Sequence, residues 1–95
     1  MHASERDQKK DWKLQQRQQA QAAFPISSSL LESLFEAVDA CVEDSGCNHS
    51  LRFTTQWIAE NKQPEKPILG WLAEHGGFCD CEVVANAADY WEQNR

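Results

Sequence analysis

The sequence predicts an all-α fold, a small bundle of three to four short helices with a loop that bears cysteine and histidine. Apolar residues recur at helical spacing between residues 30 and 42, which is the pattern of an amphipathic helix. Residues 50–60 and 64–75 repeat this pattern in shorter segments, and residues 86–93 indicate a short terminal helix. A chain of 95 residues forms one domain at most, so we expect these helices to share one core.

Residues 1–24 form a polar, glutamine-rich arm, which we expect to precede a helical Cys/His domain over residues 25–95. Strong helix formers dominate the arm, but it has no apolar stripe with which to dock. We therefore expect either an exposed helix or a flexible segment there. Trp12 and Leu14 leave open a third possibility, a helix that binds a partner.

The first core helix is expected to begin after Pro25, since proline disfavours helix at the residue before it. Ser27 and Ser29 are alternative caps two residues apart, and the sequence leaves both open. Gly46 can end this helix in a left-handed conformation.

A second helix is expected over about residues 50–60, with Asn48 or Ser50 as its cap. The third helix has to hold both Pro64 and Pro67 in its first turn, where no intrahelical N–H is required. A pair of glycines then ends it, and the segment that follows is either a turn with a short strand or one helical turn.

The net charge of −6 is unevenly distributed. Residues 1–24 carry a net charge of +2, whereas residues 25–95, with four basic and twelve acidic residues, carry −8. Such an acidic surface repels phosphate backbones, so we expect no nucleic-acid partner. No apolar run approaches the ~18–20 residues that span a bilayer, and the N-terminus lacks the apolar region of a secretory signal. We therefore expect a cytoplasmic protein without membrane contact, whose cysteines serve as metal ligands or reactive thiols more readily than as disulfides.

Two short segments carry the candidate chemistry. The segment "CNHSLRFT" (47–54) places Cys47 and His49 two residues apart at the start of the second helix. The segment "HGGFCDCEVVAN" (75–86) places Cys79 and Cys81 two residues apart after the third helix. Two ligand pairs on separate connections, brought together by helix packing, predict a four-ligand metal site. Thiolate and imidazole groups suit tetrahedral zinc better than magnesium or calcium, and so small a core gains from such a staple.

Two further residues qualify this ligand set. His75 lies four residues before Cys79 and is an alternative to His49, although it could instead interact with the carbonyl groups that end its own helix. Cys41 lies on the apolar face of the first helix, where a free cysteine is expected to pack as a small hydrophobe.

A thiol chemistry competes with the metal. Cys79-Asp80-Cys81 could cycle between dithiol and disulfide, or Cys81 could act as a nucleophile near a histidine. The carboxylates of Asp80 and Glu82 oppose this reading, because a reactive thiolate needs a cationic neighbour or a helix N-terminus. Cys47, at the start of a helix, has the more favourable position.

The stretch "CNHSLRFTTQWI", followed by "WLAEHGGFCDCEVVAN", resembles a family of small, uncharacterised bacterial proteins classified as a domain of unknown function. The family pattern is approximately C-[DN]-H-[ST]-L-R-x-T and then W-L-x-x-H-G-G-[YF]-C-D-C-E-V-x-x-N, and the resemblance covers about residues 30–90. It implies that the cysteines and histidines of both segments belong to the family pattern, whereas Cys41 and residues 1–24 lie outside it. The resemblance implies no activity.

The charged members of this pattern suggest how the site would be oriented. We expect Arg52 to pair with Glu82 or Asp80 and so to hold the loop around the metal. The expectation as a whole is a small cytosolic helical domain stapled by a zinc site, with no catalytic residue assigned, acting as a binding or adaptor module for an unknown protein partner. The alternatives are a small metal- or thiol-dependent enzyme using Cys79-Asp80-Cys81, and a plain globular protein without metal. The expected zinc ligands are Cys47, His49, Cys79 and Cys81.

Overall fold

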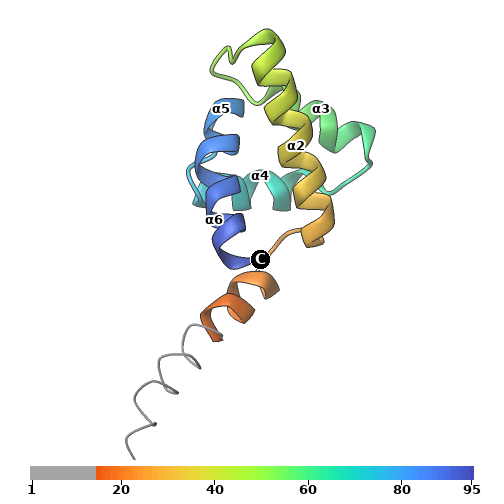
Figure 1. Ribbon diagram of the computed structural model, residues 1–95. Coiled ribbons are helices and arrows are strands. Elements are labelled where there is room, and N and C mark those ends of the chain that lie inside the picture. Colours follow the sequence, from red (N-terminus) through yellow and green to blue (C-terminus); the bar gives the residue numbers. More distant parts are fainter. Residues whose placement is uncertain (1–14) are drawn as a thin grey trace, which may run out of the picture.

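The computed structural model describes residues 15–95, and its elements are helices (Figure 1). Residues 15–22 are helical and are followed by α2 (Ser28–Ser45), α3 (Arg52–Glu60) and α4 (Glu65–Glu74). A continuous C-terminal helical segment comprises one turn, α5 (Asp80–Glu82), then the π-helical η1 (Val83–Ala87) and α6 (Ala88–Asn94). The described residues contain no strand, so the predicted all-α fold is confirmed.

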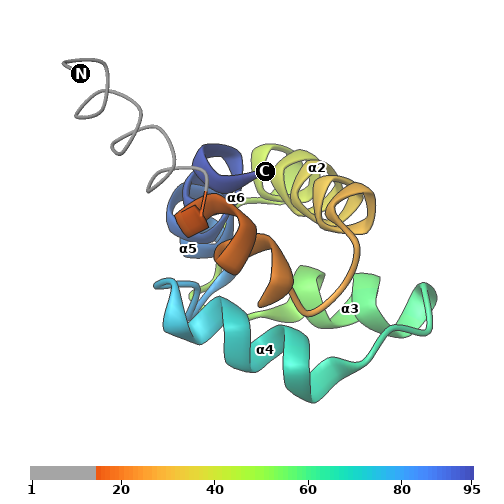
Figure 2. The same ribbon diagram turned by 90° about the horizontal axis from the view of Figure 1, so that it is seen from below.

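The helices surround one apolar core. Figure 1 shows α2 running antiparallel to the C-terminal helical segment, and Figure 2 shows α3 and α4 on the opposite side of the bundle. α2, α3, α4, η1 and α6 each contribute apolar side chains that are at most 6% exposed, as expected of amphipathic helices. The core comprises Leu31, Leu34, Phe35, Val38, Trp57, Ile58, Ile68, Trp71, Leu72, Val83, Ala87 and Trp91.

The ends of α2 agree with the sequence. Ser27 is the N-cap, and its hydroxyl accepts a hydrogen bond from the backbone N–H of Leu30 at 3.3 Å, which decides between the two alternative caps. At the other end Gly46 has φ 75°, and its N–H donates to the carbonyl of Val42 at 2.7 Å. The ψ of 171° differs from the expected left-handed helical value and directs the chain into the connection that carries Cys47.

The turn after α4 fits glycine only. Gly76 has φ 79°, and a Cβ atom there would lie 3.1 Å from the Asn86 side-chain nitrogen. A Cβ on Gly77 would lie 3.1 Å from both the Leu72 carbonyl oxygen and a methyl group of Val83. This close approach of α4 to the C-terminal helix fixes where the loop bearing Cys79 lies.

The end of the N-terminal arm packs on the bundle. Figure 2 shows residues 15–22 as a helix lying across the end of the core. Ala20 is 8% exposed, and the Gln21 side-chain amide donates to the carbonyl of Asn94 at 3.1 Å. The ring of Phe24 then meets Trp71 edge-on at 5.7 Å. Trp12 and Leu14, the possible partner-binding positions, lie outside the described residues. No helix within residues 15–95 is long and apolar enough to cross a bilayer.

Candidate metal centre

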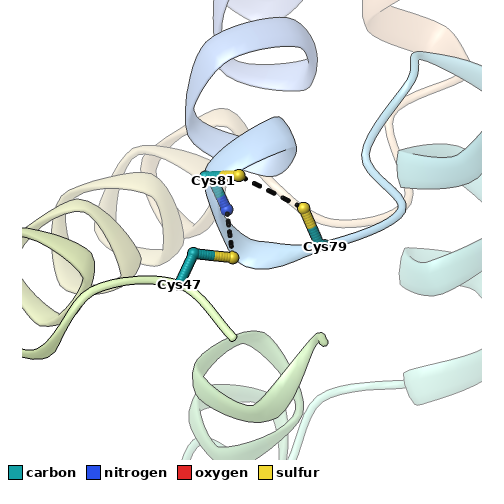
Figure 3. Close-up of side chains that lie close together, drawn as sticks. All are labelled: Cys47, Cys79 and Cys81. Atoms are coloured by element: carbon teal, nitrogen blue, oxygen red, sulfur yellow. Dashed lines mark hydrogen bonds between the residues drawn. The ribbon is translucent and has the colours of Figure 1, made fainter. Parts of the chain in front are cut away.

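Three of the four cysteines converge at one place in the fold. Cys47 follows the end of α2, Cys79 immediately precedes α5, and Cys81 lies within that single turn. Figure 3 shows their sulfur atoms facing one another. All three Sγ atoms lie within 4.8 Å of one another, and those of Cys79 and Cys81 are 3.3 Å apart. The two connections predicted to carry ligand pairs thus meet, and none of these thiols forms a disulfide.

The spacing of the sulfur atoms suits a tetrahedral metal ion. Zinc–thiolate bonds of ~2.3 Å at tetrahedral angles place sulfur atoms about 3.8 Å apart. The separation of 3.3 Å between Cys79 and Cys81 and the upper limit of 4.8 Å for all three pairs lie within about 1 Å of this value, so small side-chain rotations would bring the three thiols to bonding distance. Three sulfur donors also form a soft ligand set, which selects zinc or other thiophilic metals over magnesium and calcium.

Backbone N–H groups surround the sulfur of Cys47. The N–H of Cys81 and the N–H of His49 each donate to this sulfur at 3.4 Å. The first of these hydrogen bonds holds the pKa of the Cys47 thiol below its usual value, and the second adds to the effect against the opposing influence of burial. The hydrogen bonds to its sulfur thus favour the thiolate form of Cys47.

Cys79 behaves in the opposite way. Its pKa is raised to about 12: the backbone N–H of Glu82 favours its thiolate, but the Cys81 thiol, burial, the Cys47 thiol and the Glu82 carboxylate together outweigh that contribution. The side chain of Cys79 is only 5% exposed, and its Sγ lies 3.4 Å from a carboxylate oxygen of Glu82. Three thiolates at this spacing would repel one another, and a bound dication would remove that repulsion.

The two candidate histidines lie in different surroundings. His49 is exposed, has φ 64°, and lies outside the group of three close sulfur atoms, although its backbone contacts Cys47. A positive φ is tolerated by histidine more often than by most residues. His75 ends α4 and stacks on Tyr90, with ring centroids 3.8 Å apart, and lies 4.9 Å from Trp71. His75 is thus engaged with aromatic rings, and His49 remains the predicted fourth ligand.

Asp80 has a role that the sequence did not reveal. Although it lies between Cys79 and Cys81, its carboxylate turns away from them and is completely buried. It accepts hydrogen bonds from the backbone N–H groups of Phe53 and Thr54, both at 3.1 Å, and from the Thr54 hydroxyl at 2.8 Å. These groups begin α3, whose N-cap residue Leu51 offers no side-chain acceptor. Asp80 therefore caps α3 from a distant part of the chain.

Arg52 does not take the expected position. Its guanidinium donates to the carbonyl of Gly46 at 3.2 Å and lies over the ring of Phe53, 4.3 Å from the centroid. Within residues 15–95 the one ion pair joins Arg95 and Glu92, so the expected pairing of Arg52 with Glu82 or Asp80 is not formed. Arg52 instead braces the connection that holds Cys47. Cys41 is half-buried in α2 and lies outside the cluster.

Comparison with known proteins supports the resemblance seen in the sequence. The family model described as "Protein of unknown function (DUF2695)" matches residues 34–86, which span both cysteine-bearing connections. The chain belongs to the DUF2695 family. Uncharacterized proteins of Mycobacterium bovis and Mycobacterium tuberculosis are 32% identical to it over 65 residues, which cover 68% of this chain. The chain matches 66% of the length of these relatives, just under two thirds. No solved structure matches this DUF2695 member.

Proposed function

We propose that this chain is a small cytoplasmic binding or adaptor module whose fold is stapled by one zinc ion. Cys47, Cys79 and Cys81 would supply three ligands and His49 the fourth. The observation that carries the proposal is the convergence of three sulfur atoms within 4.8 Å, contributed by chain segments up to 34 residues apart. Zinc at such a site would add a cross-link and neutralise thiolate charge, a structural role rather than a catalytic one.

His49 is the fourth ligand most compatible with this geometry. It follows Cys47 by two residues, its N–H donates to the Cys47 sulfur, and its side chain is exposed beside the cluster-bearing connection. His75 would have to leave its stacked position on Tyr90 to reach the metal. An aromatic contact of that kind contributes ~0.5–1.5 kcal/mol, which its departure would forfeit.

A cross-link at this position would stabilise the fold substantially. A link that closes a loop of about 34 residues removes roughly 4 kcal/mol of chain entropy from the unfolded state by the loop-closure relation used for disulfides. That is a large share of the ~5–15 kcal/mol by which domains are stable. A core drawn from only four helical segments depends on such a contribution.

The test is the metal content of the full chain purified without added zinc, combined with thermal unfolding with and without a chelator. We expect about one zinc per chain and a large decrease of Tm after chelation. Cys47→Ser, Cys79→Ser and Cys81→Ser should each abolish metal retention, and His49→Ala should weaken it, whereas the matched control Cys41→Ser should keep the metal. No metal in the wild-type protein and no effect of the chelator would overturn the proposal.

Thiol chemistry is the second candidate, and the lowered pKa of Cys47 is the observation that favours it. In this candidate function the reactive thiol would be Cys47, on the connection before α3. The sequence had instead indicated the Cys79-Asp80-Cys81 segment, where the pKa of Cys79 is raised to about 12. A protein that contains no metal as purified, before any chelation, and in which Cys47 is alkylated rapidly at neutral pH would favour this candidate over the zinc staple.

A further inference from the structure

A groove of about 260 Å³ runs between α2 and the C-terminal helical segment. Phe35 and Trp91 line its apolar part, and their rings lie 5.4 Å apart. Pockets that enclose small-molecule ligands usually measure ~300–1,000 Å³. A volume below that range suits one or two side chains of a peptide better than a whole small ligand.

The α2 side of the groove is a stripe of carboxylates. Glu32, Glu36 and Asp39 line it at successive helical turns, and all three are exposed. None of them forms an ion pair within the described part of the chain, where only Arg95 and Glu92 are paired. Like charges at this spacing repel one another, and the repulsion would be relieved by cations from outside.

On the opposite side of the groove, a cationic side chain of the protein itself lies against an aromatic ring. The guanidinium of Arg95 lies over the Trp91 ring, 4.9 Å from its centroid, and pairs with Glu92 at 2.7 Å. A cation held between an aromatic face and a carboxylate is thus accommodated within this groove. On the α2 side, by contrast, the carboxylates of Glu32, Glu36 and Asp39 form no ion pair with a cationic side chain of the described residues.

We propose that this groove binds a lysine- or arginine-bearing amphipathic helix of a partner protein. The helix would place an apolar side chain against the Phe35 and Trp91 part of the groove and its cations along Glu32, Glu36 and Asp39. The inference rests on the binding-module function proposed above and names the partner's chemistry. The groove lies apart from the cysteines, since none of them lines it.

The probe is a fluorescein-labelled synthetic helix of leucine and lysine with all leucines on one face, titrated into the full-length protein by fluorescence anisotropy. A scrambled peptide of the same composition, with its leucines spread around the helix, controls for charge alone. We expect the amphipathic peptide to bind about tenfold more tightly than the scrambled one, since only it can fill the apolar part of the groove while meeting the carboxylates.

Two matched variants locate the binding site. The double substitution Glu36→Lys and Asp39→Lys reverses two charges in the groove, whereas Glu43→Lys and Asp44→Lys make the same change on the same helix outside it. We expect the first to weaken binding about tenfold and the second to change it by less than about threefold. Ala88→Phe would obstruct the groove without altering charge and should also weaken binding about tenfold.

Equal binding of both peptides, or equal weakening by both charge reversals, would show general electrostatic attraction and overturn the proposal. Binding that appears only after Lys9, Lys10 and Lys13 are replaced by Gln would overturn it in favour of the chain's own basic segment as occupant. Metal content measured on every variant separates the two proposals. A metal-free protein that binds the peptide would refute the zinc staple alone, and a zinc-loaded protein that ignores it would refute the docking groove alone.

Discussion

The buried carboxylate of Asp80 offers a sharp test of how the cysteine-bearing loop and α3 are joined. Asp80→Asn preserves the shape of the side chain and removes its charge. One amide oxygen can still accept the two hydrogen bonds from Thr54, but the amide nitrogen now faces the N–H of Phe53. One bond to a charged acceptor is lost and two become neutral bonds of about half the strength.

The magnitude follows from these three bonds. Hydrogen bonds to charged groups contribute ~1.5–3 kcal/mol each, and neutral ones about 1 kcal/mol. We therefore expect Asp80→Asn to lower the free energy of unfolding by at least about 3 kcal/mol, which corresponds to a decrease of Tm of at least roughly 12 °C for a domain of this size. Urea unfolding followed by circular dichroism measures the free energy, and a thermal scan measures Tm.

The matched control is Asp89→Asn, the same chemical change at an exposed carboxylate that accepts one bond from Gln93 on the surface of α6. It should cost about 0.5 kcal/mol or less. Asp80 lies between two proposed metal ligands, so its substitution could also affect metal binding. The comparison is therefore repeated after chelation, because the hydrogen bonds of Asp80 to the start of α3 do not require the metal. A loss no larger than that of the control, or a loss that disappears in the metal-free protein, would refute the capping role.

The remaining predictions concern thiols and one histidine. In metal-free protein at neutral pH, iodoacetamide should label Cys47 faster than Cys79, as mass spectrometry of the peptides would show; the reverse order would contradict the hydrogen bonding described above. The folded pKa of Cys79 is raised from about 9 to about 12, so its contribution to the stability of metal-free protein is complete below about pH 9 and declines as pH rises toward 12. Urea midpoints measured from pH 8 upward should therefore fall more steeply for wild type than for Cys79→Ser, and identical slopes would rule this out. His75→Ala removes the stacking on Tyr90 and should cost ~0.5–1.5 kcal/mol without changing metal content, whereas loss of the metal would identify His75 as the ligand.

The sequence predicted those features that depend on local periodicity. The apolar spacing of α2 predicted its buried face. Pro64 is the N-cap of α4 and Pro67 lies in its first turn, so neither proline interrupts an intrahelical hydrogen bond. Helix ends that depend on neighbouring residues, such as the ends of α2 at Ser27 and Gly46, could also be predicted from the sequence. The convergence of Cys47 with Cys79 and Cys81 could be predicted from the sequence, because both segments lie at or beside connections between helices, whereas His49 lies outside the group of close sulfur atoms.

Features that depend on tertiary contacts were not predictable in the same way. The start of α3 was expected about two residues earlier, with Asn48 or Ser50 as its cap, because a local acceptor is the usual one. The acceptor comes instead from Asp80, 26 residues from Thr54, and no local signal indicates that partner. For the segment after Gly77 the sequence left a turn with a short strand or one helical turn open. The structure shows the helical turn, and it continues as a π-helix with Val83 and Ala87 buried, a continuation that the sequence did not predict.

The order of residues in Cys79-Asp80-Cys81 explains why the loop can serve two purposes at once. The backbone is extended at Cys79 and turns helical at Asp80, so the two thiols face the connection after α2 while the carboxylate between them faces α3. This one turn of chain thereby contacts the connection after α2 through the sulfur atoms and the start of α3 through the hydrogen bonds of Asp80. A metal held by the thiols would fix the carboxylate that caps α3, and the cap would in turn hold two thiols opposite Cys47. The acidic residue within the motif thus supports a fixed ligand arrangement, which is what a structural staple requires.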